Sequence, residues 1–115
     1  MEPARLQKII EPLEKMLSKK GFQIDGEPMV DGAVRMASFV RPDGVKVDYT
    51  LEVRKDLDRG NYASDSDVHL DPRLYKDGQT ITLNPYFDTS SNMPAQSLVA
   101  DMVEETIQPN IEQHL

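Results

Sequence analysis

The chain has no cysteine. A chain without thiols has no disulfide framework, no thiolate zinc site, no iron–sulfur cluster and no cysteine nucleophile. It also has no apolar run near the about 20 residues that a membrane helix needs. The first ten residues, MEPARLQKII, lack the basic cluster and apolar stretch that are typical of a secretory signal. We therefore expect a cytoplasmic protein that does not span a membrane.

Positive charge is scarce in the second half of the chain. Residues 1–59 carry eleven acidic and eleven basic side chains, whereas residues 60–115 carry nine acidic side chains and only Arg73 and Lys76. The net charge of −7 therefore lies entirely in the second half. This charge disfavours phosphate backbones and anionic membranes, and none of the seven aromatic residues has a basic setting in which to stack on bases. We expect neither nucleic acid nor a membrane as a partner.

The segment 3–20 has the pattern of an amphipathic helix. Pro3 suits the first helical turn, Gly21 suits the stop, and Pro12 predicts a bend near the middle. Apolar side chains recur at steps of three and four residues and form one stripe. This stripe consists of Leu6, Ile9, Ile10, Leu13, Met16 and Leu17.

Strand patterns follow over 22–30, 33–40 and 45–53. Gly26 and Pro28 weaken the first of these strands and favour an edge position or a bulge. Asp31-Gly32 is a hairpin signal, and the last strand, VKVDYTLEV, alternates apolar with polar residues throughout. Such alternation predicts an antiparallel sheet that has one face on a core and one face in water.

Periodicity is lost over 55–79, which we interpret as a long loop with a short helical turn that begins at Asp71-Pro72. A further strand is predicted over 80–86. A second amphipathic helix is predicted from Pro94 to about Gln108, and Pro109 should end or kink it.

Together these elements predict an α+β fold with the order α-β-β-β-loop-β-α. The expected architecture is a two-layer sandwich, in which an antiparallel sheet of about four strands carries the N- and C-terminal helices on one face. No repeat or low-complexity tract appears, so residues 1–115 are interpreted as a single domain.

The second helix carries an acidic arc opposite its apolar face. We name as candidate partner-binding residues Asp101, Glu104, Glu105 and Glu112. No lysine or arginine lies four residues away to neutralise them, although lysines of the first helix would neutralise them if the two helices lay side by side. The leading hypothesis is a non-enzymatic adaptor, inhibitor or chaperone-like domain that binds a basic protein surface. A homodimer through this helix or an exposed strand edge is a further option.

Two other hypotheses use the Asp-rich segment 56–71. If it were extended, one face would carry a row of possible metal ligands, namely Asp65, Asp67, His69 and Asp71. The second hypothesis is therefore a metal- or small-ligand-binding domain. Ser66, His69 and Asp71 include the residue types of a hydrolytic triad, so the third hypothesis is a small hydrolase with a site near His69. Neither pattern matches a known motif spacing, and we expect no cofactor and no catalytic residue.

Overall fold

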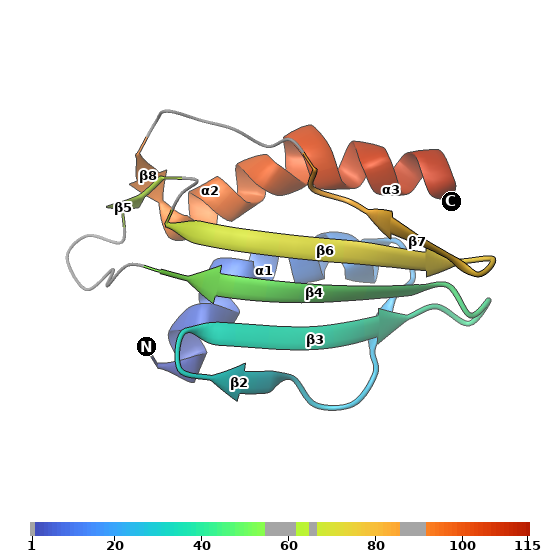
Figure 1. Cartoon of the computed structure of the whole chain (residues 1–115), viewed down its shortest axis with the longest axis horizontal. Coiled ribbons are helices and arrows are strands. Elements are labelled where there is room, and N and C mark those ends of the chain that lie inside the picture. Colours follow the sequence, from blue (N-terminus) through green and yellow to red (C-terminus); the bar gives the residue numbers. More distant parts are fainter. Residues whose placement is uncertain (1, 55–61, 65–66, 86–91) are drawn as a thin grey trace.

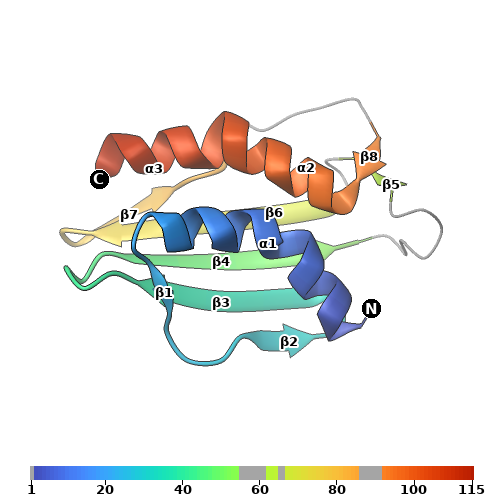
Figure 2. The same ribbon diagram turned by 180° about the vertical axis from the view of Figure 1, so that it is seen from behind.

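The computed structural model describes residues 2–54, 62–64, 67–85 and 92–115. Its first element is the helix α1 (Pro3–Lys19), whose buried side chains are the six of the predicted apolar stripe. Pro3 occupies the first turn and Pro12 lies inside the helix, which changes direction midway along its length (Figure 2). The predicted start, stop and bend of this helix are thus confirmed.

An antiparallel sheet of six strands forms the second layer (Figure 1). The strands are β1 (Gln23–Ile24), β2 (Met29–Asp31), β3 (Val34–Val40), β4 (Lys46–Val53), β6 (Val68–Lys76) and β7 (Gln79–Thr82). Their order is β1-β3-β4-β6-β7, and β2 pairs with the same edge of β3 as β1 does. Two further short strands, β5 (Tyr62–Ala63) and β8 (Met93–Pro94), pair only with each other.

Two of the turns that join neighbouring strands of this sheet have only two residues. Asp31 pairs with Val34, so Gly32 and Ala33 form the turn between β2 and β3, one residue later than predicted. Asp77 and Gly78 form the turn between β6 and β7, and both have positive φ, 54° and 76°. Positive φ at both central positions is typical of a tight hairpin turn, because its backbone twist matches that of the strands.

The prediction of a long loop over 55–79 is wrong for residues 68–76. These residues form β6, the longest strand, which lies between β4 and β7. Val68, Leu70 and Leu74 point into the core, whereas His69 and Arg73 point away from it. The alternation is therefore present in the sequence, but aspartates and a proline interrupt it.

Pro72 explains how a proline fits inside this strand. The backbone N–H of Leu83 donates to the carbonyl of Pro72 at 2.9 Å. Because the N–H and C=O of one residue in an antiparallel strand face the same neighbour, Pro72 turns its backbone toward the β7 side. The pairing between β6 and β7 begins only at Arg73. The missing donor of Pro72 therefore costs no hydrogen bond with β4.

The C-terminal helix continues through Pro109, where an end or a kink was predicted. It runs as α2 (Ala95–Met102), a π-helical turn η1 (Val103–Ile107) and α3 (Gln108–His114). In the π turn the N–H of Gln108 donates to the carbonyl of Val103, five residues back. Pro109 has no N–H for the carbonyl of Glu105, and its ring would clash with that carbonyl in a regular α-helix. The wider turn is the physical solution that keeps the helix unbroken.

Both helical segments pack against the sheet, which makes the chain an α+β fold as predicted (Figures 1 and 2). A single cluster of buried side chains joins α1, the sheet and the C-terminal helix. The helices cover one face of the sheet and leave the other face uncovered by any described element (Figure 1). Within the described residues, no helix combines the length and the apolar character that crossing a bilayer requires.

Candidate functional site

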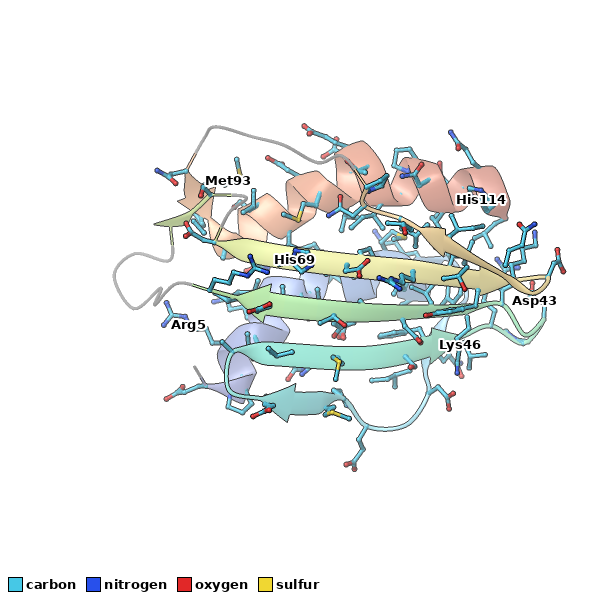
Figure 3. The ribbon with its side chains drawn as sticks, in the orientation of Figure 1. Arg5, Asp43, Lys46, His69, Met93 and His114 are labelled. Atoms are coloured by element: carbon cyan, nitrogen blue, oxygen red, sulfur yellow. The ribbon has the colours of Figure 1, made fainter. Side chains whose placement is uncertain are left out.

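The uncovered face of the sheet, called here the open face, carries the outward side chains of the three long strands (Figure 3). The register places them in rows that cross the strands. The row Ser38, Asp48 and Arg73 crosses the middle of the face, and Met36, Thr50 and Asp71 form the next row. Charged, polar and apolar side chains therefore meet on a rigid surface, which is a better platform for recognition than a loop.

A groove of about 420 Å³ lies on the open face. We call it the acidic groove, because four carboxylates and a single guanidinium of the described residues line it, together with apolar and hydroxyl side chains. Its lining is Asp25, Glu27, Met29, Met36, Ala37, Ser38, Asp48, Tyr49, Thr50, Asp71, Arg73 and Tyr75. The segment between β1 and β2 supplies Asp25 and Glu27, and the strands supply the other two carboxylates. The groove is therefore a negatively charged site that brings together residues distant in the sequence.

Among the described lining residues, the one cation is Arg73, which a neighbour already holds. Asp71 accepts hydrogen bonds from Nε and Nη2 of Arg73 at 3.1 and 2.9 Å, and this ion pair raises the pKa of Arg73. Asp48 lies directly opposite Arg73 across the strand pair. Its Oδ1 is nevertheless buried and has no hydrogen-bond partner in the described part of the chain. A buried carboxylate oxygen without a donor costs free energy, so Asp48 is an unfavourable residue for the stability of this strand pair.

Exposed methionines border the acidic groove on its β2 side. Met29 and Met36 face each other across the β2–β3 pair, and they are 61% and 37% exposed. Methionine side chains adapt their shape to a partner and occur often at surfaces that bind peptides. The groove thus combines negative charge with an apolar border.

The predicted acidic arc lies on the C-terminal helix. Glu104 and Glu105 are exposed on the π turn, and Asp101 is half-buried just before it. In the part of the chain that the structure describes, no ion pair reaches these three side chains. Glu112 differs, because Lys20 at the end of α1 binds its Oε1 at 2.9 Å. Hydrogen bonds from Lys20 and Gln108 lower the pKa of Glu112.

The predicted metal ligands do not share one site in the described residues. Asp65 and Ser66 lie outside those residues. Asp67 accepts hydrogen bonds from the backbone N and the Oγ of Ser64, which is the role of a turn residue. His69 is exposed on the open face, and Asp71 binds Arg73. Among the described residues, no three acidic, histidine or cysteine side chains are grouped in a way that could hold a metal ion.

Sequence reasoning missed a buried polar cluster beneath the open face. Arg35 on β3 is only 6% exposed, and its Nε donates to the hydroxyl of Tyr49 at 2.9 Å. The hydroxyl in turn donates to Oε2 of Glu14 on α1 at 2.5 Å. Burial, together with the carboxylate of Glu14, raises the pKa of Tyr49. The only signal in the sequence is that Arg35 occupies an inward position of the alternation in β3.

Sequence reasoning also missed the acidic groove, because its four carboxylates lie in three segments that the sequence assigns to different elements. Only Asp71 was a candidate site residue. Comparisons of this chain with protein-family models, with curated proteins and with solved structures find no match.

Proposed function

We propose that this chain is a non-enzymatic binding module for a basic segment of another protein, and that the acidic groove is its main contact. The observation that carries the proposal is the composition of the groove, in which four carboxylates and one already paired guanidinium lie beside exposed methionines. Complementary charge of this kind selects a cationic partner and accelerates association. The methionines add apolar contact, which favours a peptide chain over a free inorganic cation.

The acidic arc of Asp101 and Glu104–Glu105 is a second surface for the same class of partner. It supports the proposal because its carboxylates have no ion pair within the described part of the chain. It is the weaker candidate, because exposed charges on a helix are solvated and contribute little without a cavity. The absence of cysteine fits a cytoplasmic setting for this binding.

A binding assay with purified protein tests the proposal. The probe is a short fluorescent peptide that alternates lysine with valine, and its control has glutamate in place of lysine. The variant Asp25→Asn/Glu27→Gln removes two charges of the acidic groove without a change of size. The matched variant Glu104→Gln/Glu105→Gln removes two charges from the acidic arc.

We expect fluorescence anisotropy to report binding of the lysine peptide and none of the glutamate peptide. The groove variant should weaken the affinity several-fold, and the arc variant should weaken it less. Added salt should reduce the binding, because the charges are exposed to solvent. No binding of the lysine peptide at millimolar concentration would refute the proposal. Loss of binding in the arc variant alone would move the site to the C-terminal helix.

A further inference from the structure

Apolar side chains are exposed on both faces of one edge of the sheet. The five large hydrophobic residues that are exposed in the described part of the chain include Ile24, Met29, Val30 and Met36. The register places Met29 and Met36 on the open face. Val30 lies opposite Arg35 and Ile24 lies opposite Phe39, so both are on the helix side, with exposed fractions of 36% and 46%. A helix that docks on one face would cover only half of this set.

The backbone at this edge has a free pairing position. The N–H of Val53 donates to the carbonyl of Ala33, so alternate residues of β3, Ala33 and Arg35, turn their backbone groups toward β4. The other residues of β3, Val34 and Met36, turn their backbone groups toward β2, where they pair with Asp31 and Met29. Val30 between them turns its N–H and C=O away from the sheet. Within the described residues, β2 pairs with β3 alone, so this donor and acceptor face outward.

We infer that the basic partner segment binds as an extended strand that pairs with the outer edge of β2. This inference rests on the proposed function and adds the way in which the partner is recognised. An added strand bonds to the outward N–H and C=O of Val30, and its side chains alternate between the two faces. On the open face they lie beside Met29 and the acidic groove. On the helix side they cover Val30.

The negative charge of this edge favours a basic segment of another protein over a second copy of this chain. Residues 21–34, which include this edge, contain Asp25, Glu27 and Asp31 and no lysine or arginine. Lysine on an exposed edge is a common device against pairing, and it is absent from this one. Two such edges would place like charges side by side, which is destabilising. A strand in which lysine or arginine alternates with apolar residues matches both the carboxylates and the exposed apolar side chains.

The variant Val30→Pro tests the pairing directly. Proline removes the outward N–H of residue 30, and no hydrogen bond between β2 and β3 uses that group. Met29 is already extended, as a residue before proline prefers. The matched variant Val30→Ala keeps the N–H and removes most of the side chain. Circular dichroism and urea unfolding serve as controls that both variants fold.

The lysine–valine peptide should bind Val30→Pro about tenfold more weakly than the unmodified chain. Val30→Ala should lose less affinity, and peptide binding should slow hydrogen exchange of the Val30 amide in the unmodified chain. Equal affinity of folded Val30→Pro and the unmodified chain refutes strand addition, although the groove would still bind a basic segment. Failure of the peptide to bind at all refutes the proposed function as well. A concentration-dependent dimer that Val30→Pro abolishes would assign this edge to a second copy and overturn the choice of partner.

Discussion

The guanidinium of Arg35 lies in the buried layer between the sheet and α1, where its Nε donates a hydrogen bond to the hydroxyl of Tyr49 at 2.9 Å. The same hydroxyl donates to Glu14, and Nη2 of Arg35 lies 3.5 Å from Oε2 of Glu14. Each polar group of this cluster therefore has a partner, which is the condition for placing charge in a core. The cluster ties α1 to β3 and β4 directly beneath the acidic groove.

We predict that Tyr49→Phe lowers the free energy of unfolding by about 1–3 kcal/mol. The substitution removes the hydroxyl that links Arg35 to Glu14 and keeps the ring that stacks on Phe39. Urea denaturation measures the change. An unchanged free energy of unfolding would mean that the cluster does not hold the two layers together.

Tyr49 also makes stability depend on pH in the alkaline range. Burial and Glu14 raise its pKa in the folded state above the ordinary tyrosine pKa of about 10. Above that pH the unfolded chain loses the phenol proton and the folded chain keeps it, so the free energy of unfolding falls as the pH rises. Below it, both states hold the proton and this contribution is fully present. Urea denaturation at rising pH should show a steeper fall for the unmodified chain than for Tyr49→Phe, and equal slopes would contradict the assignment.

The ion pair between Lys20 and Glu112 predicts a shift in an acid titration. Hydrogen bonds from Lys20 and Gln108, and the charge of Lys20, hold the pKa of Glu112 below its ordinary value. The stabilisation is present above the ordinary pKa of a glutamate and is lost as the pH falls through the lowered one. In Lys20→Met we expect the pKa of Glu112 to rise, as measured by carboxyl chemical shifts. The same pKa in both proteins would show that the pair does not form in solution.

Asp48 should lower the free energy of unfolding and contribute to binding of the basic peptide. Its buried Oδ1 has no hydrogen-bond partner in the described residues, and aspartate is a poor strand former. We predict that Asp48→Thr raises the free energy of unfolding by about 1 kcal/mol. The same variant should bind the lysine–valine peptide more weakly, because the groove loses a carboxylate. A variant that is less stable than the unmodified chain would show that Asp48 has a structural role.

The sequence predicted a helix or strand and its buried side correctly where one spacing of apolar residues holds over the whole element. The apolar stripe of α1 predicted its six buried residues, and the alternation in β4 predicted its inward side. The same rule failed for β6, because Pro72 and the aspartates around it also occur in turns. Only the pairing of β6 with its two neighbours shows that the backbone of Pro72 faces β7 and not β4. Strand pairing is a property of the whole fold and is not visible in one segment. Pro109 misled in a similar way, because the π turn accommodates a proline that would interrupt a regular α-helix.

The acidic groove could not be found from the sequence, because no segment contains it. Asp48 was recognised as an outward residue of the sheet, and Asp71 was assigned to a loop. Their proximity depends on the register between β4 and β6. The outward backbone of the exposed edge could not be predicted for the same reason. Gly26 and Pro28 predicted an edge position, but the direction of the Val30 backbone depends on its pairing with β3.

Amide chemical-shift mapping tests the central claim most directly. The isotope-labelled chain is titrated with the lysine–valine peptide, and shifts are followed for every assigned amide. We predict the largest shifts at Asp25–Asp31, Asp48 and Asp71–Arg73, which surround the acidic groove. Shifts confined to residues 101–112, or no shifts at millimolar peptide, would contradict a basic segment bound on the open face.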